Sequence, residues 1–260
     1  MCTLLWAEYK KLRRSSIVWI TIFAALMIAV IVFVEGLSIH NGPDVQYGLK
    51  TVLEDSRYIE NAGWYMDEMQ PLATFFVLPA VIALLGSYMI CREEEDDTMK
   101  SLRFIPVDEI KLIAAKMIVA FIFSTLLYML LFAIAFSTEA ALHFPDLSSA
   151  LIFSCMKEYL LDGIGVFLAI SPVIAFVARI KKGYWIALVF TEFYSVAGLF
   201  AGMSSTLLPY YPINAVFNLS GYHITTTGKR AVSIIVLLLC SCFSVFLLKG
   251  LKHNRESSLE

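Results

Sequence analysis

Charged side chains that could bind a partner are concentrated in one stretch of this sequence, residues 92–116. The stretch reads REEEDDTMKSLRFIPVDEIKLIAAK and lies between two long apolar runs. A charged stretch of this length beside apolar runs indicates a surface on which a soluble partner docks. The alternative is a solvated acidic turn at EEEDD, because a run of like charges usually lies on a hydrated face.

Residue patterns for catalysis are missing from the sequence. No Gly-x-x-x-x-Gly-Lys-Ser/Thr occurs, so no loop of that kind can cradle nucleotide phosphates. No His-Glu-x-x-His and no Cys/His spacing suited to zinc occurs, and the histidines are expected in loops, at His40, His143, His223 and His253. We therefore expect no catalytic residue, no bound metal and no cofactor in this chain, and any ATP would be hydrolysed by a partner.

The composition is that of a membrane protein. Hydrophobic residues make up 59% of the 260 residues, charged residues 16%, and the mean hydropathy is +0.74. Apolar runs long enough to cross a bilayer lie at residues 17–34, 72–90, 112–136, 159–177, 184–203 and 231–248. Lipid offers no partner for free N–H and C=O groups, and a barrel would show alternation. The sequence predicts an all-α integral membrane fold of six helices in one domain over residues 1–260.

The distribution of basic residues predicts the orientation. With both termini on one side, fifteen of the 20 Lys and Arg residues fall on that side, whereas the first loop of the other side is acidic. Basic residues in short loops are retained on the cytoplasmic side. We therefore expect a multi-pass protein of the cell membrane with both termini in the cytoplasm. The net charge of −2 gives no indication of nucleic-acid binding.

The first 16 residues, MCTLLWAEYKKLRRSS, predict a short helix in the membrane interface. Leu5, Trp6, Tyr9 and Leu12 can share one helical face, with the neighbouring Lys and Arg residues on the other. A plain positively charged flank is the alternative. The apolar run that follows ends without a small-x-small cleavage pattern, so we expect no cleaved signal peptide.

The charged stretch itself predicts a second short helix outside the membrane, over residues 98–104. Asp96 or Asp97 can cap its start, acidic residues there suit the positive end of a helix, and Pro106 ends it. A rigid knob of this kind is what a separate ATPase needs in order to push on the spans.

At these residues the chain resembles the permease subunits of type-2 ABC exporters, including those of bacitracin and lantibiotic resistance or immunity. Those permeases carry an acidic stretch, Gly-Thr, a Lys two residues on, a Leu, a Pro, and a Lys entering the third span. The matching positions are Thr98, Lys100, Leu102, Pro106 and Lys116. Asp97 replaces the usual Gly, and Asp108 with Glu109 stands where the family often has an Arg.

The resemblance implies a function and a set of partners. The short helix would be the coupling helix, seated in a groove of the ATPase through Glu95, Asp97, Thr98, Lys100, Leu102, Pro106 and Lys116. The N-terminal helix would be the elbow. The partners implied are two cytoplasmic ABC ATPase subunits, which carry ATP and magnesium, and a second permease copy or a relative. Hydrophobic or amphipathic compounds such as antimicrobial peptides would be exported.

Polar residues inside the apolar runs are candidates for a substrate path. An ionisable group costs ~2.5–3.5 kcal/mol at a helix centre on insertion scales, so it usually faces a cavity or a partner. Glu192 lies deep in span five, and Asp162 is expected near the hydrated outer end of span four. Hydrogen bonding within the bundle is the alternative for Glu192.

Several other positions predict local structure. Gly198 and Gly202 form a Gly-x-x-x-Gly that allows close helix packing, while Pro79 and Pro172 are expected to kink their spans. The apolar segment 204–219 is broken by two prolines and predicts a helical hairpin that folds back into the outer leaflet. An interfacial aromatic belt is the alternative.

Two further classes of function stay open. A non-transporting immunity or sensor protein would use the same surface only to anchor an ATPase. An intramembrane protease of the Glu-Glu-x-x-x-Arg type fits poorly, because Glu93-Glu94 is followed at the required offset by Thr98 and Glu94-Glu95 by Met99.

Overall fold

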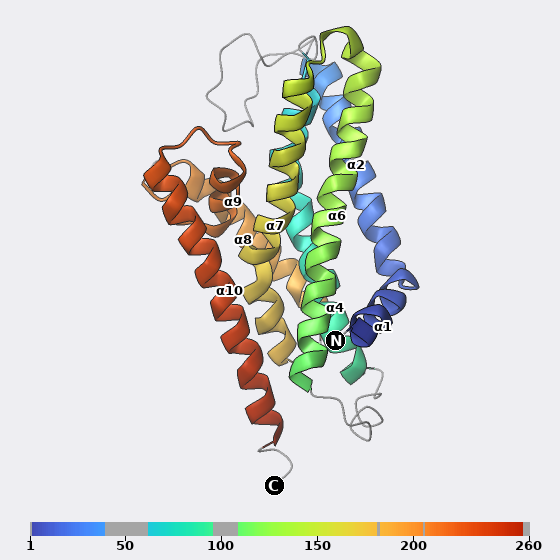
Figure 1. Ribbon diagram of the computed structural model, residues 1–260, viewed down its shortest axis with the longest axis vertical. Coiled ribbons are helices and arrows are strands. Elements are labelled where there is room, and N and C mark those ends of the chain that lie inside the picture. The colour runs from blue at the N-terminus through green and yellow to red at the C-terminus, as the bar shows by residue number, and fades with distance from the viewer. Residues whose placement is uncertain (1, 40–61, 96–108, 181–182, 205, 257–260) are drawn as a thin grey trace.

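Six long helices form one bundle in the computed structural model of the chain (Figure 1). The structure describes residues 2–39, 62–95, 109–180, 183–204 and 206–256, apart from the side chains of a few residues at the edges of these ranges. Within these ranges the chain contains helices and turns and no strand. The prediction of an all-α fold with six candidate membrane spans is confirmed.

The first helices run from the N-terminus to the middle of the bundle. Helix α1 (Cys2–Arg13) lies at one end and leads into α2 (Ser16–Ile39). The second span is built from α3 (Trp64–Leu72), a π-helical turn η1 (Ala73–Val77) and α4 (Leu78–Glu95). Pro79 lies two residues after the end of the π turn, as the second residue of α4. Because Pro lacks an N–H, a change in the hydrogen-bond ladder next to it is expected.

The remaining spans complete the bundle. They are α6 (Glu109–His143), α7 (Ser149–Ile180), α8 (Trp185–Gly202) and α10 (Thr227–Glu256); a 3-10 turn η2 (Phe144–Asp146) joins α6 to α7, and a short helix α9 (Pro212–Ser220) precedes α10. Helix α6 has 35 residues and α7 has 32. At 1.5 Å per residue both approach ~50 Å, which exceeds a ~30 Å hydrocarbon core. Their corner therefore extends beyond the other helices in Figure 1.

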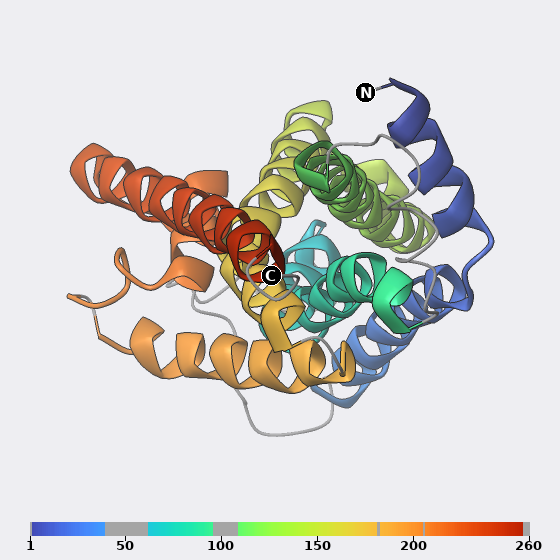
Figure 2. The ribbon, with the colours of Figure 1, turned by 90° about the horizontal axis from the view of Figure 1, so that it is seen from below.

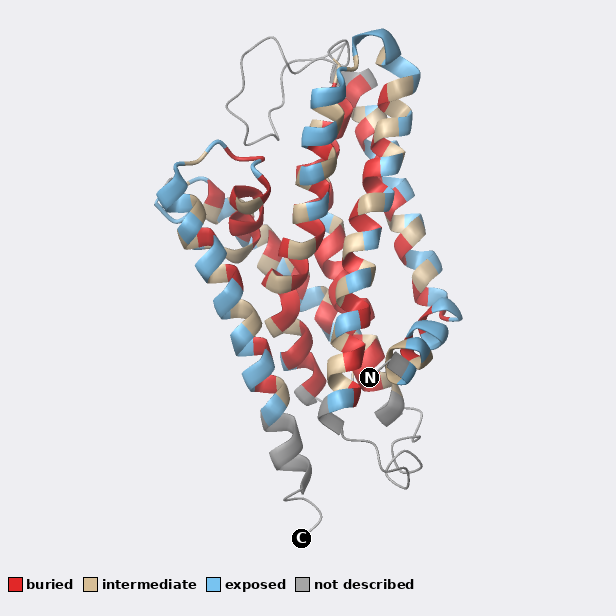
Figure 3. Cartoon of the chain, in the orientation of Figure 1, coloured by how far each residue is buried: buried red, intermediate tan, exposed pale blue. Residues whose placement is uncertain are grey.

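Helices α4 and α7 form the centre of the bundle, as the end-on view of Figure 2 shows. In the most apolar stretch of Trp64–Arg92, 83% of residues are buried, against 22% in Thr227–Lys249. Helix α7 packs against α4, α6, α8, α9 and α10. The outer faces of α2, α8 and α10 carry exposed apolar side chains (Figure 3), so lipid or another subunit must cover them.

Pro172 lies inside α7 without interrupting it. Its missing N–H deprives the Leu168 carbonyl of its helical donor. The Ser171 hydroxyl donates to that carbonyl at 2.9 Å, and the Ser244 hydroxyl of α10 donates to the Ser171 carbonyl at 3.1 Å. The Ser171 side chain thus replaces the hydrogen bond that Pro172 removes, and Ser244 links α10 to the same turn of α7.

Segment 204–219 contains the short helix α9, which packs against α7, α8 and α10. Pro212 occupies its first turn, where a missing N–H costs nothing, and Gly221 ends it with a left-handed φ of 102°. Ile213, Val216 and Phe217 are fully buried. The segment therefore folds back against the bundle as a helix. Its depth in the bilayer stays a prediction.

Candidate functional site

Two of the predicted coupling residues, Glu95 and Lys116, lie on helices that the structure describes, Glu95 at the end of α4 and Lys116 near the start of α6. Asp97, Thr98, Lys100, Leu102 and Pro106 fall outside the described residues, and Glu95 is the last residue of α4. Lys116, on α6, is buried at 3% exposure. Both chain termini lie at this end of the bundle (Figure 1).

Helix α1 also lies at this end and packs against α6. Its apolar face is divided differently from the sequence prediction. Leu12 is buried and Leu5 packs against the core, whereas Trp6 is 62% exposed and Tyr9 is 55% exposed. The buried Glu8 completes the inner face, with Oε1 2.8 Å from Lys11 Nζ. The predicted helix is present; its place in the membrane interface stays a prediction.

Asp162 does not lie at a hydrated helix end, as the sequence suggested. Helix α7 starts at Ser149, well before the apolar run used to place the span, so Asp162 is fully buried within it. Gln70 of α3 donates from Nε2 to Asp162 Oδ2, whereas the Ser220 hydroxyl at the end of α9 donates to the Phe217 carbonyl at 3.3 Å. Oδ1 has no hydrogen-bond partner among the described residues. Asp162 therefore joins α3 to α7 in the core.

More polar side chains surround this group. The hydroxyls of Thr74 and Tyr128 lie 3.0 Å apart, and the Tyr159 hydroxyl donates to the Met66 carbonyl at 2.7 Å. Next to the end of α9, burial raises the pKa of Tyr222 well above 10.0, and the nearby carboxylates Glu68 and Asp67 raise it further. The phenol therefore stays neutral and acts as a hydrogen-bonding group.

Glu192 lies in a different environment, half-buried on α8. Thr191 and Ser195 on either side are buried, Phe193 is 74% exposed, and the Tyr194 hydroxyl donates to the Ala169 carbonyl at 3.2 Å. Glu192 thus lies at the edge between the packed face of α8 and its outer apolar face. No hydrogen bond or ion pair in the described part of the chain joins Glu192 to Asp162, so the two acidic residues do not form one site there.

The two glycines of the Gly-x-x-x-Gly are both buried on α8. A Cβ at Gly198 would lie 3.2 Å from the Tyr211 ring and 3.4 Å from Ile213 Cβ. Asn214 of α9 donates to the Gly198 carbonyl at 2.8 Å. Gly198 therefore admits α9 within this chain, and Gly202 ends the helix.

The sequence analysis missed Glu139, which the structure places at 0% exposure near the outer corner of α6. Its carboxylate accepts hydrogen bonds from the backbone N–H of Gly63 at 2.8 Å and of Tyr65 at 3.0 Å. These are N–H groups at the start of α3, where a negative charge suits the helix dipole. His143 lies at the end of α6 and His253 lies within α10, so the expectation that both are in loops is wrong. His143 Nδ1 is 2.8 Å from Glu139 Oε1. The i, i+4 spacing of Glu139 and His143 in the sequence could have indicated this pair, because residues four apart are neighbours on a helix.

Replacing Glu139 by Ala is expected to destabilise the folded chain by about 2–6 kcal/mol, because two buried N–H groups lose their acceptor at ~1–3 kcal/mol each. The midpoint of thermal unfolding in detergent, followed by tryptophan fluorescence, measures the effect. Asp146→Ala is the matched control, since Asp146 is an exposed acid at the same corner. Equal midpoints for the two variants would show that the cap contributes nothing.

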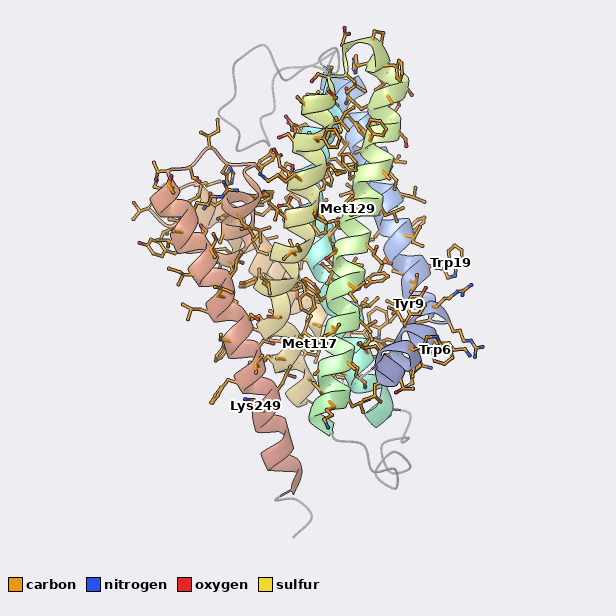
Figure 4. The ribbon with its side chains drawn as sticks, viewed as in Figure 1. Trp6, Tyr9, Trp19, Met117, Met129 and Lys249 are labelled. Atoms are coloured by element: carbon orange, nitrogen blue, oxygen red, sulfur yellow. The ribbon has the colours of Figure 1, made fainter. Side chains whose placement is uncertain are left out.

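A groove opens between α6, α7 and α10, with a volume of about 380 Å³. Apolar side chains line most of it, including Met117, Phe121 and Phe167, and the hydroxyls of Ser171 and Ser244 lie on its wall. Lys249 stands at its edge, toward the end where the termini lie (Figure 4). Such a surface suits an amphipathic molecule with an apolar body.

The fold and these surfaces define a class of protein: a multi-pass helical membrane protein whose described residues hold no group of His, Cys, Asp and Glu suited to a metal. The family model for ABC-2 family transporter proteins matches residues 4–198, so the chain belongs to this family. The resemblance seen in the sequence is thereby confirmed.

One relative supports the same assignment. The chain is 29% identical over 128 residues to the bacitracin transport permease protein of Bacillus licheniformis. The matched segment covers 48% of this chain and 61% of that protein. The chain therefore spans less than two thirds of the length of this relative. No solved structure gives a significant match.

Proposed function

We propose that the chain is the membrane-spanning permease subunit of an ATP-driven ABC exporter. The observation that carries this proposal is the family match over residues 4–198 together with the six-helix bundle. Two ABC ATPase subunits would dock on the end of the bundle where α4 ends and α6 begins, on the cytoplasmic side of the cell membrane. A second permease, identical or related, would complete the transporter against the exposed apolar faces.

The exported compounds would be hydrophobic or amphipathic, with antimicrobial peptides such as bacitracin as the specific candidate. The name of the relative supports this substrate class. The groove between α6, α7 and α10 is the surface of the described chain that suits it best, because its wall is apolar and Lys249 and the serine hydroxyls offer polar contacts at one side.

The test is ATP-dependent movement of bacitracin in inside-out membrane vesicles that contain the chain and its ATPase. Transport that depends on both proteins is expected. Filling the groove with Ala114→Trp should lower the transport rate roughly tenfold, which corresponds to about 1.4 kcal/mol. Leu126→Trp is the control, since Leu126 is 60% exposed on α6 outside the groove.

Binding of the ATPase without any movement of the peptide would instead favour a non-transporting immunity or sensor protein. Equal transport by the Ala114→Trp and Leu126→Trp variants would remove the groove from the substrate path while leaving the permease assignment in place.

A further inference from the structure

A second hollow lies at the end of the bundle where the termini are, between α1, the start of α2 and the end of α4. Its volume is about 620 Å³. The basic residues Lys10, Lys11, Arg14 and Arg92 line it together with Trp6, Ser15, Ser16 and Tyr88. No residue that lines this hollow also lines the groove between α6, α7 and α10.

The hollow concentrates positive charge. Glu8 lies 2.8 Å from Lys11. Lys10 Nζ lies 4.7 Å from the centre of the Trp6 ring, and Arg92 Cζ lies 5.5 Å from that of Tyr88. Aromatic rings attract cations without neutralising them. An anion placed in the hollow would be attracted by the basic side chains that line it.

The start of α2 adds to this preference. Ser15 caps the helix, since its Oγ accepts from the Ile17 N–H at 3.3 Å, and the hydroxyls of Ser15 and Ser16 line the hollow. The positive end of a 24-residue helix therefore faces the same space as the four basic side chains. This combination of N–H groups, hydroxyls, Lys and Arg is suited to a phosphate group.

The surroundings of the hollow indicate where the phosphate comes from. Trp6 is 62% exposed and Trp19 is 73% exposed, and both lie on the same side of the bundle around the junction of α1 and α2 (Figure 4). Exposed Trp side chains are typical of the membrane interface, and basic clusters next to a membrane helix attract anionic lipids. An acidic protein surface would not need these apolar rings.

We propose that this hollow binds the phosphate headgroup of an anionic phospholipid from the leaflet at this end of the bundle. The headgroup bridges α1 and α4. The consequence for activity rests on the proposed function: because α4 leads directly into the predicted coupling residues, the bound lipid fixes the elbow helix relative to the segment assigned to the ATPase contact, and anionic lipid raises ATP-driven activity.

Quenching of Trp6 by brominated lipids tests the proposal. In the full-length chain, Trp19→Phe, Trp64→Phe and Trp185→Phe leave Trp6 as the reporter. Brominated phosphatidylglycerol should quench it more strongly than brominated phosphatidylcholine, with a binding preference of roughly fivefold per basic residue engaged. Arg14→Gln should reduce the preference by that factor. Arg13→Gln is the matched control, because the neighbouring Arg13 carries the same charge and does not line the hollow.

Three outcomes would overturn the proposal. An equal loss with Arg13→Gln and Arg14→Gln would show diffuse surface charge and no site. Inorganic phosphate that abolishes the preference would make the ligand a free anion. Loss of the ATPase from the Arg14→Gln variant, with lipid preference unchanged, would make the hollow a protein-docking surface. Equal thermal unfolding midpoints of the two variants exclude a folding defect as the cause.

Discussion

A Gly163→Leu variant is expected to lose most of its folded protein, because α6 and α7 are packed backbone to backbone at this position. A Cβ at Gly163 would lie 2.9 Å from Thr125 Cα and 3.1 Å from Tyr128 Cβ. The Ser124 hydroxyl donates to the Gly163 carbonyl at 2.8 Å, which fixes the close approach. Extra methylenes inserted into a packed core typically cost ~1–3 kcal/mol in total and occasionally more, and here leucine would place its carbon atoms against backbone.

Size-exclusion chromatography of the detergent-extracted chain measures the yield of monodisperse protein. Gly228→Leu is the control, since a Cβ at Gly228 meets nothing within 4 Å. An equal yield of the Gly163→Leu and control chains, with equal unfolding temperatures, would contradict the close packing of α6 against α7 at this position. The neighbouring Asp162 makes this position important for the polar core as well.

The second large effect is expected at the predicted coupling helix. Lys100→Glu reverses a charge in the segment that the family resemblance assigns to the ATPase contact, and it should lower ATP-driven export by at least tenfold, corresponding to ~1.4 kcal/mol or more of lost coupling. Lys157→Glu, an exposed position on α7, makes the same change in net charge away from the coupling segment. ATP-dependent transport by the two variants in the same vesicles is the measurement. Equal rates would contradict the assignment of the coupling helix.

The six spans could be predicted because lipid forces apolar, fully hydrogen-bonded helices, and each apolar run marks one of them. The ends of the helices were less accessible. Helix α7 begins at Ser149 and α6 reaches His143, because helices continue through polar residues beyond the hydrocarbon core. Asp162 was expected near water because the predicted span began only a few residues before it, but it lies well inside α7 and is buried. Glu139 was overlooked because it lies beyond the predicted end of its span, although it is still within α6.

Contacts between distant residues were beyond reach from one sequence. Gln70 and Asp162 meet across two helices, and Glu139 caps a helix that starts far away in the chain. No local pattern encodes such pairs. The helix α1 was predicted correctly, but an apolar stripe on a helix does not show which of its residues contact protein. In the structure Leu5, Glu8 and Leu12 face the bundle, whereas Trp6 and Tyr9 face away from it.

The most direct measurement of the central claim is the recovery of an ABC ATPase with the purified chain. The tagged wild-type chain, co-produced with the ATPase, should retain the ATPase through affinity purification. The purified complex should hydrolyse ATP faster than the ATPase alone. The Lys100→Glu chain should lose the ATPase, and the Lys157→Glu chain should keep it. A wild-type chain that purifies without the ATPase, or a Lys100→Glu chain that retains it fully, would contradict the account.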